Sequence, residues 1–243
     1  IDIIMFVNLY GNIVDCDKLQ LVNQFFGRSV PTIEDAAQSF GADYKGRQSG
    51  SLATISCLSF DPTKNFNNYG NGGLVLTDDV NLNKDIMSMR DNGKQSFHTE
   101  PGTNSRMSDV DCAQMMVKLK YFATWQGRRK QIAEYYDKEL SHTDLQLIRY
   151  SSDVEPAYSK YVIQLDDRHA LISHLNRSRI GTKITYEYSL PSLPVVRHIV
   201  NPKEYTQASR HVRRCLSLPI YPELTDAEVE YIANSVRLFQ NTA

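Results

Sequence analysis

The chain has 243 residues, 41% of them hydrophobic and 23% charged, and its 27 basic residues nearly balance its 28 acidic ones, for a formal net charge of −1. This composition is typical of a folded globular protein and excludes both a disordered chain and a miniprotein held together by disulfides. Because neither charge is in excess, we expect no nucleic acid and no anionic membrane as a partner.

The first half of the chain alternates predicted strands and helices. Apolar runs of strand length, bounded by Gly, Pro, Asn or Asp, lie at Ile3–Val7, Val30–Ile33, Ile55–Phe60 and Leu74–Leu76. Between the first two strands, apolar residues from Leu19 to Phe26 repeat at helical spacing up to Gly27. This order predicts an α/β domain with a largely parallel sheet, and such sheets bind ligands at the carboxyl ends of their strands.

The second half begins with helices. Ser108 and Asp111 predict a helix cap, and a second helix carries Ile132, Tyr136 and Leu140 on one side. A further α/β unit is then predicted, with a strand at Tyr158–Leu165, a helix at Arg168–Asn176, a strand at Thr182–Tyr188 and a last helix capped by Thr225 and Glu228. We therefore expect two domains, a larger one in residues 1–124 and a smaller one in residues 125–243 that includes a connecting helix.

No apolar run approaches the roughly 18 residues of a transmembrane helix, and the first residues resemble neither a signal nor a transit peptide. The chain begins inside a predicted strand and without Met, so we expect it to be the C-terminal part of a longer protein. Cys16, Cys57, Cys112 and Cys215 are scattered singly, with no C-x-x-C pair and no His at ligand spacing. We therefore expect buried free thiols, no metal site and a cytoplasmic location.

Polar residues that could carry chemistry gather in two stretches, each after a predicted strand. The first is Glu34-Asp35-Ala36-Ala37-Gln38, and the second runs from Ser59 to Asn65 and includes Lys64. A lysine at a strand end near a buried carboxylate is what pyridoxal phosphate requires, because the amine forms a Schiff base and the carboxylate keeps the pyridine nitrogen protonated. On the residues alone two ordinary alternatives stay open: Lys64 as a solvated surface residue, and Asp35 as a helix cap.

Taken together, many short segments in order resemble the DegT-type (DegT/StrS) family of nucleotide-sugar aminotransferases that depend on pyridoxal 5'-phosphate (PLP). The matching segments are Leu9-Tyr10-Gly11, Glu34-Asp35-Ala36-Ala37-Gln38, Gly50-Ser51, Ser59-Phe60, Pro62-Thr63-Lys64-Asn65, Gly72-Gly73, Asn104-Ser105-Arg106-Met107, Arg129 with Ile132-Ala133 and Tyr136, Gly181, Leu216-Ser217-Leu218-Pro219 and Tyr221-Pro222. The resemblance implies a fold-type I PLP-dependent transferase: a large α/β domain with a mostly parallel sheet, incomplete at its N-terminus, and a smaller C-terminal α/β domain.

The same resemblance implies roles for five residues. Lys64 corresponds to the catalytic lysine that forms the Schiff base, and Asp35 to the catalytic partner of the pyridine nitrogen. Gln38 corresponds to the residue beside the phenolic oxygen of the cofactor, and Ser59 to a phosphate ligand. Asn104 corresponds to the residue that reaches the phosphate in the neighbouring subunit, which implies a homodimer with shared active sites.

The implied activity is transfer of an amino group from an amino acid, expected to be L-glutamate, to a keto-deoxysugar nucleotide for cell-surface polysaccharide or secondary-metabolite synthesis. One alternative is a PLP-dependent sugar dehydratase of the same family, but those enzymes carry histidine at the position of Lys64. Another is a catalytically silent regulatory or interaction protein that retains the fold. The intact set of Asp35, Gln38, Ser59 and Lys64 argues against it.

The chain also departs from the family pattern. The N-terminal segment that supplies a phosphate-binding loop has no counterpart here, so no residue of this chain is assigned that role. Asp61, Asn71, Ser159 and the stretch Thr185-Tyr186-Glu187-Tyr188 differ from the usual residues. Several of these changes lie near the expected sugar pocket, so the resemblance does not define the sugar.

Overall fold

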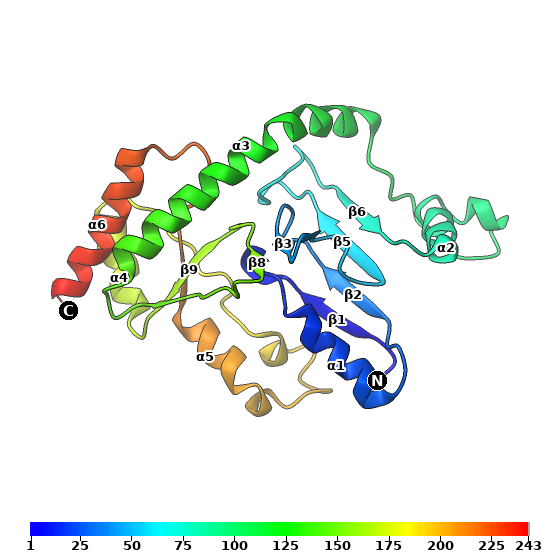
Figure 1. Ribbon diagram of the computed structural model, residues 1–243, viewed down its shortest axis with the longest axis horizontal. Helices are drawn as coiled ribbons and strands as arrows, with labels where there is room; N and C mark the ends of the chain where they lie inside the picture. The colour runs from blue at the N-terminus through cyan, green and yellow to red at the C-terminus, as the bar shows by residue number, and fades with distance from the viewer. Residues whose placement is uncertain (243) are drawn as a thin grey trace. The chain divides into compact units, whose positions relative to one another are not determined.

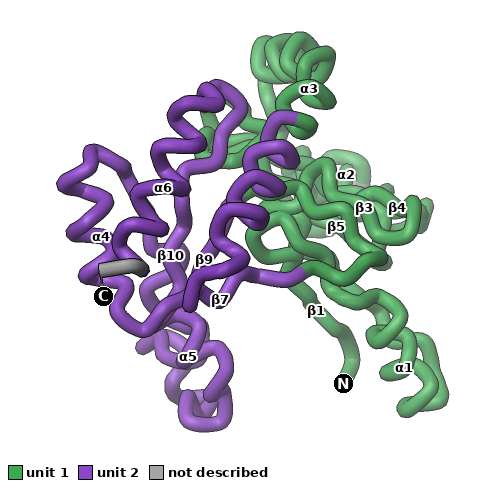
Figure 2. The backbone as a smooth tube through the Cα atoms, turned by 60° about the vertical axis from the view of Figure 1, so that its left-hand side comes forward, with its two compact units in different colours: residues 1–127, 150–159 green, residues 128–149, 160–243 purple. Residues whose placement is uncertain are grey.

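The computed structural model describes residues 1–242 and divides into two compact units (Figure 2). Unit 1 comprises residues 1–127 and 150–159, and unit 2 comprises residues 128–149 and those from 160 onward. None of the helices in residues 1–242 is long and apolar enough to cross a membrane. All four cysteines are free thiols; Cys16 and Cys215 are buried as expected, whereas Cys112 is exposed, contrary to the expectation.

Unit 1 is built on a four-stranded sheet (Figure 1). The strands β1 (Ile4–Val7), β2 (Thr32–Asp35), β5 (Ile55–Ser59) and β6 (Gly73–Leu76) lie in the order β1-β2-β5-β6. The first three are parallel and β6 is antiparallel, so the predicted, largely parallel sheet is confirmed. β2 lies two residues later than predicted and begins directly after Pro31, which has no N–H to donate to a neighbouring strand.

Helix α1 (Cys16–Phe26) connects β1 to β2 and ends at Gly27 as predicted. Asp15 accepts a hydrogen bond from the backbone N–H of Lys18 at the N-terminus, and Gly27 adopts a left-handed φ of 61° at the C-terminus. Both are standard helix-capping arrangements. Core residues from β1, α1 and the following loops form one apolar cluster that includes Phe6, Ile13, Cys16, Ala42, Tyr44, Leu52, Val154 and Ala157.

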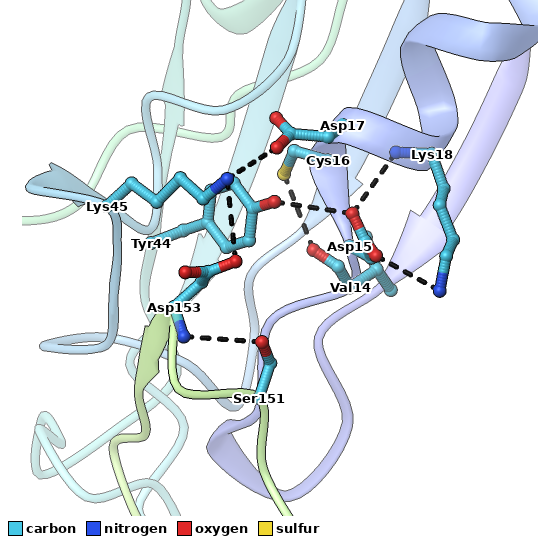
Figure 3. Close-up of polar contacts among 9 residues, drawn as sticks. All are labelled: Val14, Asp15, Cys16, Asp17, Lys18, Tyr44, Lys45, Ser151 and Asp153. Carbon is cyan, nitrogen blue, oxygen red and sulfur yellow. Dashed lines mark hydrogen bonds and ion pairs between the residues drawn. The ribbon is translucent and has the colours of Figure 1, made fainter.

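The last two residues of that cluster come from the later stretch of unit 1, residues 150–159. The hairpin of β3 (Asp43–Tyr44) and β4 (Arg47–Gln48) pairs with β8 (Val154–Glu155) in an antiparallel sheet. In Figure 3 the Lys45 ammonium lies between the carboxylates of Asp17, at 2.5 Å, and Asp153, at 3.4 Å. The two carboxylates, Asp17 most of all, raise the pKa of Lys45, so the Lys45 side chain is a cation at neutral pH.

A second attachment of this stretch is made at Gly11, in the short 3-10 helix η1 (Leu9–Gly11) after β1. The Gly11 carbonyl accepts a hydrogen bond from Ala157 N at 2.8 Å. Gly11 has a φ of 92°, and a Cβ at this position would lie 2.8 Å from the backbone nitrogen of Tyr158. Only glycine fits this close approach.

After β6 the chain forms α2 (Val80–Arg90), the short η2 (Lys94–Ser96) and the long α3 (Asp109–Leu140). The predicted cap is confirmed, since Ser108 Oγ accepts a hydrogen bond from Asp111 N at 3.1 Å. The prediction of two separate helices is wrong, because α3 is continuous from unit 1 into unit 2 (Figure 1). Gly127 lies inside it, where a glycine costs about 1 kcal/mol relative to alanine but does not break a helix.

Unit 2 contains an antiparallel sheet of β10 (Cys215–Leu218), β9 (Tyr161–Gln164) and β7 (Gln146–Leu147). Its helices are α4 (Arg168–Arg177), α5 (Thr206–Arg214) and α6 (Asp226–Thr242), with short η3 (Leu190–Ser192) and η4 (Pro202–Glu204). The predicted strand at Thr182–Tyr188 is wrong. Of the described residues in this stretch only Lys183 pairs, in an isolated bridge with Ser217 of β10, because the backbone bends at Thr185 and again at Glu187 and Tyr188 instead of staying extended.

Two family residues on α3 support unit 2. The buried Arg129 donates to the Ile220 carbonyl at 2.7 Å, and the Tyr136 hydroxyl donates to the Pro219 carbonyl at 2.9 Å. Burial lowers the pKa of Arg129 to about 10. At α6 the predicted capping box is confirmed, because Glu228 accepts from Thr225 N at 2.9 Å and donates its own N–H to Thr225 Oγ1 at 3.3 Å.

Candidate active site

The carboxyl ends of β1, β2 and β5 lie at one edge of the unit 1 sheet. Asp35 is the last residue of β2 and Ser59 the last of β5, and the register pairs Asp35 with Cys57. Since alternate residues of a strand share a face, Asp35, Cys57 and Ser59 belong to the same face of the sheet. The turns that follow these two strands carry Gln38 and Lys64. The fold therefore brings four of the five predicted site residues to one edge.

Asp35 is half-buried and is held by the turn that follows it. One carboxylate oxygen accepts a hydrogen bond from Ala37 N at 3.0 Å. Burial first, and then the carboxylates of Asp35 and Glu34, raise the pKa of the Cys57 thiol on the neighbouring strand. Asp35 thus lies in a partly desolvated position, in which a charge acts more strongly on a bound group than it does in water.

Gln38 connects the turns after β1 and β2. Its side-chain oxygen accepts a hydrogen bond from the backbone N–H of Tyr10 at 2.9 Å. Tyr10 lies in the first turn of η1, where backbone N–H groups have no partner within the helix. The amide of Gln38 is therefore fixed by the backbone of the preceding strand end.

Ser59 and Lys64 lie in a compact turn after β5. The hydroxyl of Ser59 accepts a hydrogen bond from Asp61 N at 3.3 Å, and Lys64 N donates to the Asp61 carbonyl at 2.9 Å. Lys64 is half-buried. Within residues 1–242 its ammonium group makes no hydrogen bond or ion pair. A lysine that is partly covered and has no carboxylate partner is available to react with a carbonyl carbon.

Asn65 and Phe66, the two residues directly after Lys64, hold its loop through contacts that the sequence does not predict. Asn65 Nδ2 donates to the Phe40 carbonyl at 3.0 Å, which joins the turns after β5 and β2. The Phe66 ring lies in a cluster with Phe40, Phe60 and Phe122, with ring centroids between 4.8 and 6.0 Å apart. The segment directly after Lys64 is thus anchored by packing and by a hydrogen bond.

Glu34 is the main residue of this edge that the sequence did not single out. It is fully buried at the face opposite to Asp35. Its carboxylate accepts hydrogen bonds from Asn8 Nδ2 (2.8 Å), Ser49 Oγ (2.7 Å), Gly50 N (3.1 Å), Leu52 N (3.2 Å) and Ser56 Oγ (2.6 Å). A buried charge is tolerated when its acceptor positions are filled in this way. The only sequence signal is an acidic residue inside an apolar strand.

Asn104 lies away from these turns along the chain, in the segment after α2. It forms a β-bridge with Asp91, at the C-terminal end of α2, and its side chain is exposed. Asp91 is itself paired with Lys94 at 3.0 Å and with Arg106 at 3.8 Å, and these contacts, Lys94 most of all, lower its pKa. The described contact of Asn104 is thus with Asp91 at the end of α2, and not with any of the four predicted site residues at the sheet edge.

The sheet and its edge define the class of protein, which is the α/β fold of fold-type I PLP-dependent transferases. The solved structure of DesV from Streptomyces venezuelae has a TM-score of 0.92 to this chain at 30% identity, and covers 98% of this chain and 65% of its own. A DegT DnrJ EryC1 StrS aminotransferase from Brucella abortus has a TM-score of 0.90 at 26% identity, over 97% of this chain and 64% of its own.

The sequence profile of the DegT/DnrJ/EryC1/StrS aminotransferase family matches residues 2–237, so the chain belongs to this family. It is 30% identical to the UDP-2-acetamido-2-deoxy-3-oxo-D-glucuronate aminotransferase of Pseudomonas aeruginosa, over 93% of this chain and 62% of the relative. It is 31% identical to the dTDP-3-amino-3,4,6-trideoxy-alpha-D-glucose transaminase of Streptomyces venezuelae, over 95% of this chain and 62% of the relative. A relative from Geobacillus stearothermophilus, called a pleiotropic regulatory protein, is 30% identical to this chain, over 96% of this chain and 64% of the relative. The chain thus spans less than two thirds of the length of these relatives.

Proposed function

We propose that the full-length protein is a PLP-dependent aminotransferase that moves an amino group from L-glutamate to the keto carbon of a nucleotide-linked sugar. The observation that carries the proposal is the position of Lys64 in the turn after β5, at the same sheet edge at which β2 ends in Asp35. The named activities of two relatives, which are aminotransferases of nucleotide-linked sugars, support it. We further propose that the aminated sugar serves cell-surface polysaccharide or secondary-metabolite synthesis.

The groups at the sheet edge fit the cofactor of the family, pyridoxal 5'-phosphate. This cofactor carries an aldehyde, a ring nitrogen, a phenolic oxygen and a phosphate. The chain offers an amine at Lys64, a carboxylate at Asp35, an amide at Gln38 and a hydroxyl at Ser59 for these four groups, in that order. When bound, the cofactor supplies an electron sink for the charge that develops as a C–H bond breaks.

Each residue then has a separate task. Lys64 would bind the aldehyde carbon through its amine. When the amino donor takes that place, the freed amine would hold and pass on the proton that leaves the α-carbon of the donor. Such positioned proton transfer contributes about a hundredfold to ten-thousandfold to a rate. Asp35 would hold a proton on the ring nitrogen of the bound cofactor with its carboxylate, and the protonated ring would stabilise the charge that develops in both halves of the reaction.

We propose that the protein acts as a homodimer in the cytoplasm. The exposed Asn104, on a loop held by Asp91, would complete the phosphate site of the neighbouring subunit, so that a two-fold axis generates two equal sites. The cytoplasmic location is supported by four free thiols, two of which are exposed or partly exposed.

A second candidate function is regulatory, because one relative is called a pleiotropic regulatory protein. In that case the fold would be retained without turnover. A third, a PLP-dependent sugar dehydratase, is disfavoured by the lysine at position 64, because the resemblance associates dehydratases with histidine there.

One experiment tests the proposal. The full-length protein is mixed with PLP, reduced with borohydride, digested and examined by mass spectrometry. We expect the reduced adduct on the peptide that contains Lys64, and none at this position in Lys64→Ala. Lys120→Ala, an exposed lysine on α3, serves as the matched control and should retain the adduct. An adduct confined to another peptide would show that Lys64 is wrongly assigned. If the adduct forms on Lys64 but L-glutamate leaves the cofactor absorbance unchanged, the regulatory function is favoured.

A further inference from the structure

Helix α3 holds the loop that follows Lys64 by means of two side chains. Lys118 donates from its ammonium to the Asn67 carbonyl at 2.7 Å and to Asn67 Oδ1 at 2.9 Å. The same ammonium lies 4.7 Å from the centroid of the Tyr69 ring. One cation thus binds two oxygens and an aromatic face, all within five residues of Lys64. A cation over an aromatic ring adds to the attraction of its hydrogen bonds.

The neighbouring turn of α3 makes the second contact. Gln114 Nε2 donates to Asn68 Oδ1, and Asn68 is almost completely buried. The backbone N–H of Asn68 donates to the Phe60 carbonyl at 2.8 Å, and its side chain donates to the Asn71 carbonyl at 3.3 Å. Two consecutive loop residues are therefore held by one rigid helix.

The other end of the loop is fixed as well. Asn65, directly after Lys64, is tied to the Phe40 carbonyl, and Asn67 Nδ2 donates back to the Pro62 carbonyl at 2.8 Å. Because Asn67 contacts both Pro62 and Lys118, it joins the turn that contains Lys64 to helix α3. The backbone of Lys64 then has little freedom to move, while its side chain makes no hydrogen bond or ion pair within residues 1–242.

We propose that Lys118 is a positioning residue for Lys64: by holding Asn67 and Tyr69 against α3 it fixes the place from which the Lys64 amine reacts. This inference rests on the proposed function of Lys64. A reacting group must be held to within roughly 0.5 Å of its productive position, so a looser loop lowers the rate without removing the group. Lys118 acts only through the loop and touches no reacting atom.

A long cationic side chain suits this position. It donates to a backbone carbonyl and a side-chain amide oxygen while its charge faces the ring. Methionine would keep the apolar stem of Lys118 and lose all three contacts. Arginine would keep the charge, several N–H donors and the attraction to the ring. These two substitutions separate the contacts of the ammonium from the packing of the stem.

The test measures attachment of PLP to Lys64 rather than turnover. Full-length protein freed of cofactor is mixed with PLP, samples are reduced with borohydride at set times, and the modified Lys64 peptide is quantified by mass spectrometry. We expect Lys118→Met to slow attachment at least about tenfold, as loss of hydrogen bonds from a charged donor implies. Lys118→Arg should restore most of the rate. Lys120→Met, two residues along the same helix and exposed, should match the unchanged protein.

Amide hydrogen exchange provides a second readout. In Lys118→Met the amides of Asn68 and Tyr69 should exchange faster, whereas those of Gly50 and Leu52, which donate to Glu34, should not change. Equal attachment rates and equal exchange in Lys118→Met and Lys120→Met would overturn the inference. Slower attachment with faster exchange throughout unit 1 would also overturn it, because the effect would then be general destabilisation. If the unchanged protein forms no adduct on Lys64, the proposed function fails instead.

Discussion

Glu34 and Asp35 are consecutive residues of β2, and their carboxylates lie on opposite faces of the sheet. Glu34 is fully buried and accepts hydrogen bonds from side chains and backbone groups of unit 1. Asp35 is half-buried and ends β2 at the sheet edge whose turns carry Gln38 and Lys64. Strand alternation thus places two carboxylates that are adjacent in sequence in different surroundings. Changes at the two positions should therefore have different effects.

Asp35→Asn tests the chemical role. The amide keeps the shape of the side chain and an oxygen for Ala37 N, but it loses the negative charge that the proposed function requires for a proton on the ring nitrogen. We expect the full-length protein to bind PLP and to unfold at an unchanged temperature, while turnover falls by orders of magnitude. Steady-state kinetics and a cofactor titration measure the two effects. Turnover close to that of the unchanged protein would rule out this role.

Glu34→Gln tests the structural role. The substitution replaces an acceptor oxygen by an NH₂ group that faces other donors, among them Ser56 Oγ and Leu52 N. We expect the free energy of unfolding to fall by about 2–4 kcal/mol, because buried donors lose their acceptor. Urea unfolding gives this value, and Glu134→Gln on the exposed side of α3 is the control. A change below about 0.5 kcal/mol would mean that the network contributes little.

We expect the contribution of Asp137, in unit 2, to the stability of the folded protein to depend on pH. Burial raises the pKa of Asp137 above its ordinary value of 3.8, and the hydrogen bond from the Tyr161 hydroxyl, at 2.8 Å, offsets this only in part. The folded protein therefore holds the proton more tightly than the unfolded chain, so ionisation of Asp137 costs stability as the pH rises through the raised pKa.

Asp137→Asn removes this cost and keeps an oxygen for Tyr161. The variant should unfold at a higher temperature than the unchanged protein at pH 7. The difference should vanish below pH 3.8, where the carboxyl group is protonated in both folded and unfolded states. Thermal unfolding followed by circular dichroism at a series of pH values measures this. A difference that does not depend on pH would point to packing instead.

Mixing two inactive variants of the full-length protein tests the shared site. If Asn104 completes the neighbouring site, dimers of Lys64→Ala with Asn104→Ala contain one site with both defects and one with neither. Activity should return to about one intact site per mixed dimer once subunits exchange. Mass spectrometry of the intact dimers verifies the exchange. Exchange without recovery, from an Asn104→Ala parent that is strongly impaired on its own, would show that each subunit builds its own site.

Local patterns were sufficient to predict the elements whose causes are local. The strands of the unit 1 sheet, the α1 cap at Gly27 and the capping box at Thr225 and Glu228 follow from apolar runs and capping residues close together in sequence. The predictions failed where the structure of a segment depends on its pairing with residues far away in the sequence. The stretch Thr182–Tyr188 has strand-forming residues, but only Lys183 pairs with β10 and the backbone bends after it. Two separate helices were predicted where the structure has the single helix α3.

The residues of the candidate site also fall into those that could be predicted from local sequence and those that could not. Asp35 and Lys64 could be singled out because each follows a predicted strand, and the family resemblance then supplied their roles, which stay predictions. The contacts of Glu34 and Lys118 could not be predicted. Lys118 lies 51 residues from Asn67 in sequence, and the most distant hydrogen-bond partner of Glu34 named above, Asn8, is 26 residues away. A single sequence carries no signal for such pairs.

Unit 1 is assembled from two stretches, 1–127 and 150–159, and this affects how the protein is made. The second stretch provides β8, the Asp153 partner of Lys45 and the core residues Val154 and Ala157. During synthesis the ribosome must therefore release residues up to 159, including part of unit 2, before the first unit can close its core. A protein cut after residue 127 would leave that core open. Unit 1 therefore cannot be isolated as one continuous fragment without carrying residues 128–149 with it.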